Sequence, residues 1–302
     1  MKPIFVDLQV NGHGGVDLLS AKTVDDVRKV SRSLFQNEVA GYLATLITAP
    51  LDSALSALKL IEEVRKNPQP GEAIILGTHL EGPFISLEKR GVHPEEFVKD
   101  PDLAHMKALL AAGFIKQVTL APELPGAIEL IKYLVGEGVV VSLGHSNATR
   151  SEAIAGFAAG AKTVTHLFNA MPKPPLSGLA DAALERSDVV IQIIVDGVHV
   201  SNELLKDTMP KILERFIVTN DAVAAAGLGE GTFPFGGMEV TVTNGAARRV
   251  DGTLAGGVAN LRASLAKLKE LNISDSIAMA SVTTRPCELI GVSYDSLSNN
   301  FK

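Results

Sequence analysis

The sequence predicts an α/β protein of the (β/α)8 (TIM) barrel class, folded as a single domain over residues 1–302. Eight short apolar, β-branched runs recur along the chain, and segments with a helical period of 3.6 residues separate them. Strands that are apolar on both faces and alternate with helices are typical of parallel sheets covered on both sides. An open doubly wound sheet shares these features, but eight units in 302 residues favour a closed barrel.

Each predicted strand precedes a polar or glycine-containing loop. The eight strands are Ile4–Gln9, Tyr42–Thr48, Ala73–Leu80, Ile115–Ala121, Val139–Gly144, Lys162–Phe168, Val189–Asp196 and Arg215–Asn220. The clearest helical patterns between them are Asp25–Val39, Asp52–Lys66, Glu123–Gly136 and Asn202–Leu213.

The pattern changes after the eighth strand. We expect a flexible loop over Gly227–Gly237. Two strands then flank an Asn-Gly dipeptide, which predicts a hairpin of Met238–Thr243 and Ala246–Val250. Helices are expected near Val258–Leu271 and Ser274–Ile290.

The composition excludes several classes of protein. The 28 Lys and Arg residues against 34 Asp and Glu give a formal net charge of −6, and no basic block is present. Neither nucleic acid nor an anionic membrane is therefore an expected partner. No apolar run approaches the ~18 residues of a membrane span, and no signal-peptide pattern precedes Ile4, so we expect a cytoplasmic protein. The single cysteine, Cys287, excludes an internal disulfide and a cysteine-rich metal site.

Polar side chains gather at the ends of the predicted strands, where the active sites of barrels lie. Glu81 follows the third strand, His145 the fifth and Asp221 the eighth, while His166 falls within the sixth. One carboxylate and two imidazoles make a three-ligand set for a divalent cation such as zinc and leave a position for water. A further carboxylate would accept a proton from that water. Any one of these histidines could be structural, but their joint occurrence favours a metal site.

Several sequence strings resemble a known family. HLEGPF at 79–84, GHSNAT at 144–149, THLFNAMP at 165–172 and DGVHV at 196–200 occur in this order. Together they closely resemble N-acetylglucosamine-6-phosphate deacetylases of the amidohydrolase superfamily, as do FVDLQVNG at 5–12, APE at 121–123 and GTLAG at 252–256. The likeness implies a hydrolase of amino-sugar catabolism. It would remove acetate from N-acetyl-D-glucosamine 6-phosphate and give D-glucosamine 6-phosphate.

The resemblance also implies a metal centre. One divalent metal ion per subunit, expected to be zinc, would be bound by Glu81, His145 and His166. Asp221 would be the general base that activates water and then the acid that protonates the leaving amine. Gln9 and Asn11 stand where many amidohydrolases carry a His-x-His pair, and amides are poor ligands beside imidazole, so these two would mark a vacated metal position or support the ligands. We expect His79 to orient the ligands, because strand alternation puts it on the same face as Glu81.

Substrate contacts follow from the same likeness. His93 would help to hold and polarise the acetyl carbonyl. Backbone N–H groups of Asn169 and Ala170 would reach the substrate, and His199 would contact the sugar phosphate. The family's phosphate-binding Arg has no counterpart here, and Lys173 could replace it as a point charge.

Two other departures affect the interpretation. The small β-sandwich domain that usually accompanies this family's barrel is expected to be missing. Asn220 is an extra residue before Asp221 and could turn its carboxylate away from the metal. Two alternatives therefore stand beside the deacetylase. One is a related amidohydrolase that acts on another N-acetylated substrate, either a galacto epimer or an unphosphorylated sugar. The other is a non-catalytic barrel that binds a sugar phosphate. A homodimer is expected, because barrels of this family are commonly dimers.

Overall fold

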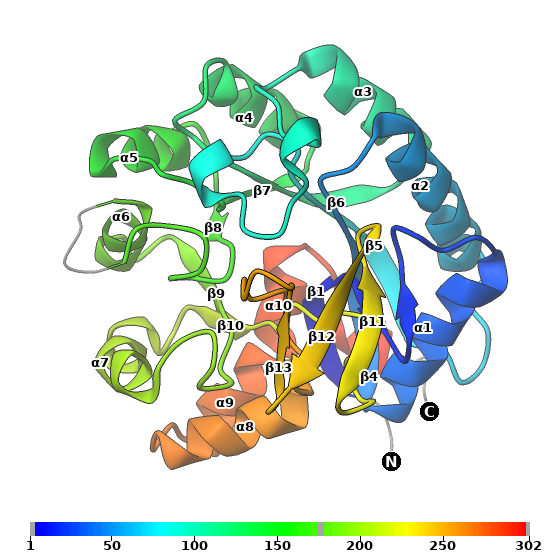
Figure 1. The fold of residues 1–302 in the computed structure, drawn as a ribbon. Coiled ribbons are helices and arrows are strands. Elements are labelled where there is room, and N and C mark those ends of the chain that lie inside the picture. Colours follow the sequence, from blue (N-terminus) through cyan, green and yellow to red (C-terminus); the bar gives the residue numbers. More distant parts are fainter. Residues whose placement is uncertain (1–3, 174–177, 300–302) are drawn as a thin grey trace.

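Eight parallel strands form a nearly closed barrel in the computed structural model, which describes residues 4–173 and 178–299 (Figure 1). In order around the barrel, the strands are β1 (Phe5–Val10), β4 (Val39–Ile47), β5 (Ile74–Glu81), β6 (Ile115–Leu120), β7 (Val140–Leu143), β8 (Thr163–Val164), β9 (Val190–Ile193) and β10 (Phe216–Val218). The predicted fold class is confirmed, and each of the eight predicted strands is present with shifted ends.

The barrel closes through a few backbone hydrogen bonds just beyond β10. Ala222 N–H donates to Gln9 O, and Ala222 O accepts from the N–H groups of Asn11 at 2.7 Å and Gly12 at 3.1 Å. Val10 and Ala222 form an isolated parallel bridge. Because the closure lies at residue 222, the preceding residue, Asp221, is held at the carboxyl end of the barrel.

Helices surround the strands (Figure 1). They are α1 (Val24–Gln36), α2 (Leu51–Lys66), α3 (Leu103–Ala112), α4 (Ala127–Gly136), α5 (Arg150–Ala158), α6 (Leu179–Glu185), α7 (Asn202–Ile212), α8 (Leu261–Glu270), α9 (Asp275–Ser281), α10 (Thr284–Leu289) and α11 (Tyr294–Asn299), with short 3₁₀ turns η1 (Leu87–Lys89) and η2 (Glu95–Phe97). The apolar faces of the helices and the outward side chains of the strands form one large buried core. Within the described residues, no helix has the length and apolarity to cross a bilayer.

Two small antiparallel sheets accompany the barrel. One pairs β2 (Gly12–His13) with β3 (Val16–Asp17), and the other joins β11 (Gly231–Phe235), β12 (Met238–Thr243) and β13 (Ala246–Arg248). The predicted hairpin is confirmed, and Asn244 and Gly245 at its turn both have positive φ, as the tight turn requires. None of the sheets in the described ranges forms a β-sandwich.

Three local predictions are wrong. The expected loop Gly227–Gly237 contains β11, because its aromatic and β-branched side chains suit pairing with β12. The sixth strand ends at Val164 instead of Phe168, because the buried apolar residues after it belong to a compact loop. The expected helix Ser274–Ile290 is two helices, since Pro286 has no N–H and is tolerated only in the first turn of α10.

A buried ion pair ties α1 to the chain before β5. Arg28 Nη1 lies 2.7 Å from Glu72 Oε2, and the Glu72 side chain is only 1% exposed. Glu72→Ala would remove the carboxylate that pairs with Arg28 and leave its guanidinium group buried without a counter-charge. We therefore expect the free energy of unfolding to fall by about 3–5 kcal/mol, measured by urea titration. The matched control is Glu185→Ala, which removes the exposed partner of Arg150 and should cost far less. Equal losses in the two variants would contradict the prediction.

Candidate active site

Glu81, His145 and His166 converge at the carboxyl ends of β5, β7 and β8. Glu81 Oε1 lies 3.0 Å from His166 Nε2 and 3.2 Å from His145 Nε2, and the two Nε2 atoms are 3.1 Å apart. All three residues are buried, and their candidate ligand atoms lie within 4.8 Å of one another. One carboxylate and two imidazoles at this spacing are a suitable donor set for a divalent cation.

The orientation of His145 also suits a metal ligand. Its Nδ1 lies 2.9 Å from the backbone oxygen of Lys89, in η1. A carbonyl only accepts, so Nδ1 donates to it, and Nε2, which faces Glu81 and His166, is the ring nitrogen that would bind a metal. His145, His166 and Asp221 have left-handed backbones, with φ of 47°, 32° and 51°. Such strain in non-glycine residues is common at functional sites and must be supported by surrounding contacts.

The electrostatics of the cluster favour a cation. Burial opposes ionisation of Glu81, but hydrogen bonds and charge from His145 and His166 outweigh it and hold its pKa well below the usual value. Burial likewise favours neutral His166, but the Glu81 carboxylate reverses this effect and raises the pKa of His166. Glu81 therefore remains a carboxylate that needs positive charge opposite it, which either an imidazolium or a metal ion would provide.

Two amides at the end of β1, Gln9 in the strand and Asn11 just after it, serve as hydrogen-bond donors to the two carboxylates. Gln9 Nε2 donates to Glu81 Oε1 at 2.8 Å, and Asn11 Nδ2 donates to Asp221 Oδ1 at 2.7 Å. Alternate residues of a strand face the same side, so Asp7 also points inward. It accepts hydrogen bonds from Thr219 Oγ1 at 2.9 Å and from the backbone N–H of Gln9 at 3.1 Å. β1 and the residue that follows it thus contact both carboxylates, and Asp7 also binds Thr219 in the segment before Asp221.

Asp221 remains directed into the site despite the residue inserted before it. Asn220 is held by Ser264 Oγ, which lies 3.4 Å from its Oδ1, and Gly256 packs so closely that a Cβ there would meet Asp221 O at 2.6 Å. Burial and the negative charge of Glu81 raise the pKa of Asp221, while the histidines and Asn11 oppose them. A buried carboxylate with a raised pKa can both accept and return a proton.

His93 lies beside the cluster on the connection that follows β5. Its ring centroid is 4.4 Å from that of His145, and its Nε2 is 3.8 Å from Glu81 Oε2. Burial, reinforced by the positive charge of His145, holds the pKa of His93 well below the usual value. The ring is therefore neutral near pH 7 and carries one N–H.

A cavity of about 320 Å³ opens over the cluster. Besides the three candidate ligands, its walls include every other residue predicted to touch substrate and the predicted base: His93, Asn169, Ala170, Lys173, His199 and Asp221. His199 Nδ1 is 2.7 Å from Asp196 Oδ2, and its Nε2 has no hydrogen-bond partner among the described residues. Lys173 is exposed at the rim, and residues 174–177 of the stretch after it lie outside the described residues.

The sequence also matches known proteins along nearly its whole length. The family model described as "Amidohydrolase family" matches residues 1–293. This chain belongs to the amidohydrolase family. An N-acetylgalactosamine-6-phosphate deacetylase of Escherichia coli O157:H7 is 32% identical over 297 residues, which cover 96% of this amidohydrolase and 78% of the relative. The N-acetylglucosamine-6-phosphate deacetylase of Homo sapiens is 34% identical over 309 residues, which cover 97% and 75%.

Solved structures show the same relationship. The crystal structure of the N-acetylglucosamine-6-phosphate deacetylase of Pasteurella multocida matches this amidohydrolase with a TM-score of 0.88 at 33% identity, covering 96% of this chain and 76% of that one. A variant of the Mycobacterium smegmatis enzyme, solved in complex with N-acetyl-D-glucosamine-6-phosphate, matches with a TM-score of 0.89 at 31% identity, covering 96% and 78%. The resemblance found in the sequence motifs is confirmed.

His79 forms its hydrogen bonds with hydroxyl groups and not directly with the candidate ligands. Its ring nitrogens bind hydroxyl groups, Thr119 Oγ1 at 2.7 Å and Thr45 Oγ1 at 3.4 Å, and neither bond reaches Glu81. Thr119 Oγ1 in turn lies 2.7 Å from Thr165 Oγ1, next to His166. Any influence of His79 on the ligands therefore passes through this chain of hydroxyl groups.

Two contacts of the site were not predicted from the sequence. Lys89 holds His145 through a backbone oxygen, which leaves no signal in the side-chain pattern. Thr48 binds His93, and a signal for it existed, because Thr48 ends the second predicted strand at the same mouth as the other polar residues.

If Glu81, His145 and His166 bind the metal of this amidohydrolase, a substitution of Glu81 should weaken metal binding. Glu81→Gln replaces the only carboxylate of the proposed donor set with a weak ligand. We expect the affinity for Zn²⁺ to fall by more than about 100-fold, measured by competition with a chromogenic chelator. Glu95→Gln is the control, because Glu95 is exposed and pairs with Arg90. An unchanged affinity in Glu81→Gln would show that the metal binds elsewhere.

Proposed function

We propose that this amidohydrolase hydrolyses the acetamide of N-acetyl-D-glucosamine 6-phosphate, giving acetate and D-glucosamine 6-phosphate in amino-sugar catabolism. The observation that carries the proposal is one cavity that joins a Glu-His-His cluster, a buried carboxylate and a neutral imidazole. Amide hydrolysis needs activated water, a polarised carbonyl and a proton for the leaving nitrogen, and this set can meet all three needs. Relatives named as deacetylases of N-acetylhexosamine 6-phosphates support the choice of substrate.

Glu81, His145 and His166 would hold one divalent cation, whose Lewis acidity activates water and polarises carbonyl groups. Asp221 accepts the proton released when water attacks the acetyl carbon. The N–H of His93 donates to the carbonyl oxygen, on which negative charge develops. When the C–N bond breaks, Asp221 returns its proton to the amine nitrogen, so that acetate and the amino sugar leave with all atoms balanced.

The finer features of the proposal rest on chemistry and on the family. Zinc is the proposed metal, because it commonly accepts one carboxylate and two imidazoles and keeps an open position. We also propose a homodimer in the cytoplasm. Light scattering tests the oligomeric state, and fractionation of cells followed by immunoblotting tests the location.

A galacto substrate is the second candidate, since a relative at 32% identity is named N-acetylgalactosamine-6-phosphate deacetylase. The deciding experiment measures acetate release by zinc-loaded protein. The substrates are the 6-phosphates of N-acetylglucosamine and N-acetylgalactosamine, each beside its unphosphorylated form. Preference for the gluco phosphate supports the proposal, and preference for the galacto phosphate replaces it with the second candidate. No release from any of the four would contradict both.

Asp221→Asn tests the proposed base. The amide keeps the size of the side chain but cannot accept a proton, so kcat should fall by about 10²–10⁴-fold. The zinc content should stay unchanged, because Asp221 is not among the three proposed ligands. Steady-state kinetics and elemental analysis on the same preparation provide the two readouts, and a variant that keeps its full kcat would exclude Asp221 as the base.

Lys173→Ala tests phosphate recognition. If Lys173 provides a point charge at the rim, KM for the phosphorylated sugar should rise about tenfold, the size expected for a lost charged hydrogen bond. KM for the unphosphorylated sugar should not change. Lys22→Ala is the control, since Lys22 lies outside this cavity. The proposal for Lys173 fails if both substrates respond equally.

A further inference from the structure

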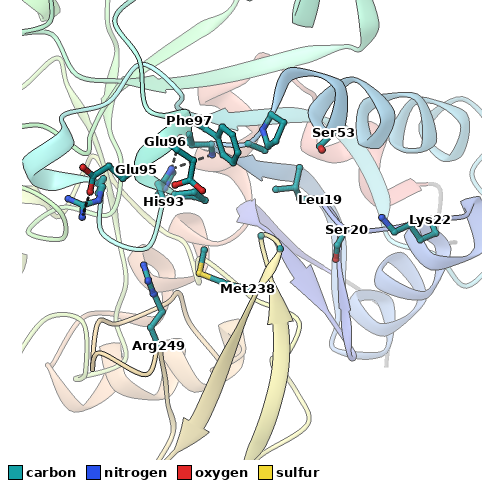
Figure 2. A pocket seen from close by; sticks show the side chains of 17 residues that line it. Leu19, Ser20, Lys22, Ser53, His93, Glu95, Glu96, Phe97, Met238 and Arg249 are labelled. Carbon is teal, nitrogen blue, oxygen red and sulfur yellow. Dashed lines mark hydrogen bonds and ion pairs between the residues drawn. The ribbon is translucent and has the colours of Figure 1, made fainter.

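Two cavities meet at His93. One is the 320 Å³ cavity over the metal-ligand cluster, and the other has a volume of about 610 Å³. Figure 2 shows the larger cavity, with His93 at its wall and Leu19, Met238 and Arg249 around it. Thr48 also lines the larger cavity. His93 therefore lines both cavities, although it is only 1% exposed.

We propose that Thr48 is a positioning residue for His93, which holds the imidazole with its proton on Nε2 and directs that N–H into the smaller cavity. The proposal rests on the function proposed above, in which His93 donates to the acetyl oxygen. It goes beyond that function because it names the group that makes His93 a donor.

The position of the ring proton follows from the hydrogen bonds of Nδ1. The backbone N–H of Thr48 points to His93 Nδ1 at 3.3 Å. A backbone N–H only donates, so Nδ1 must accept and cannot carry the proton. An imidazole ring carries at least one N–H, so the proton lies on Nε2. Nε2 is 3.8 Å from Glu81 Oε2, beyond hydrogen-bond distance, so its N–H is available to a substrate.

The side chain of Thr48 adds the shorter contact. Thr48 Oγ1 lies 2.8 Å from Nδ1, and because Nδ1 is an acceptor, the hydroxyl donates. Two donors on one nitrogen oppose rotation of the ring, since the rotated ring would place a C–H against them. In the alternative tautomer the hydroxyl could accept from Nδ1–H, but the backbone N–H of Thr48 would point at that ring N–H. Both arrangements leave buried polar groups unpaired, which is costly.

The surrounding chain is shaped to admit this hydroxyl. Thr48 follows the end of β4 and is only 2% exposed. Gly82 faces it with φ of 87°, and a Cβ at Gly82 would collide with Thr48 Oγ1. The backbone N–H of His93 donates to Arg90 O at 3.1 Å, which holds the residue from its own loop. Glycine at position 82 thus leaves the space that the Thr48 hydroxyl occupies beside Nδ1.

A pair of substitutions separates the hydroxyl from the shape of the side chain. Thr48→Val keeps the size and removes the donor, and we expect kcat to fall about tenfold with little change in KM, the effect of one lost hydrogen bond. Thr48→Ser keeps the donor and should stay within about threefold of the unsubstituted protein. Ser53→Ala, at a residue that lines the same cavity but makes no hydrogen bond to His93, should change kcat less than twofold. Equal kcat values for Thr48→Val and Thr48→Ser would overturn the proposal.

A double-mutant cycle tests whether Thr48 acts through His93. In a His93→Gln background, Thr48→Val should lower kcat by less than about twofold, because the group that it orients is gone. A full tenfold loss in that background would assign Thr48 a separate role and overturn the proposal.

Nitrogen NMR of ¹⁵N-histidine-labelled protein measures the tautomer without any substrate. We expect the Nε2–H form for His93, with added motion or a second form in Thr48→Val. An Nδ1–H form in the unsubstituted protein would overturn the proposal whatever the enzyme hydrolyses. If the NMR result holds and no acetylated sugar is hydrolysed, the proposed function fails while the orientation of His93 by Thr48 stands.

Discussion

The backbone hydrogen bonds between Ala222 and the end of β1 determine where the chemistry of this protein can lie. They join the last strand to the first without a full ladder, and they do so one residue after Asp221. The hydrogen bonds that close the barrel therefore also fix the position of the Asp221 carboxylate. Loss of these bonds would open the barrel at the point where its functional groups converge, and the left-handed backbone of Asp221 would lose its support.

The end of β1 and the residue after it place hydrogen-bond donors beside this closure. Gln9 donates to Glu81 and Asn11 donates to Asp221, so two neutral amides stand beside two carboxylates. A neutral amide stabilises a carboxylate by hydrogen bonding but does not cancel its negative charge. The positive charge that Glu81 requires is left to the histidines and to a metal ion. Amides are also weak metal ligands beside imidazole, so Gln9 and Asn11 suit the proposal of one metal ion rather than two.

The architecture and most of the site could be predicted from the sequence, because both leave local signals. Apolar runs of strand length identify the barrel, and Glu81, His145 and Asp221 stand directly after such runs. The loop around His166 could not be predicted, because a buried irregular segment has the same apolar composition as a strand. The bond from Gln9 to Glu81 joins residues 72 positions apart, and no local pattern encodes it. The task of Thr48 depends on the ring nitrogen that it touches, which only the fold reveals.

The buried carboxyl group of Asp7 makes the stability of the fold depend on pH. Burial raises its pKa from 3.8 to about 7, against hydrogen bonds from Gln9, Thr219 and Asn220. A carboxyl whose pKa is raised by folding binds its proton more tightly in the native state, so the stability it contributes is full below pH 3.8 and is lost as the pH rises to about 7. In the proposed mechanism Asp221 must be ionised to accept a proton from water, and a higher pH favours that form. Across the neutral range, a rising pH therefore lowers the stability that Asp7 contributes but favours the ionised Asp221 that the proposed reaction needs. The two carboxyl groups that cause these opposite effects lie close together at the end of the barrel.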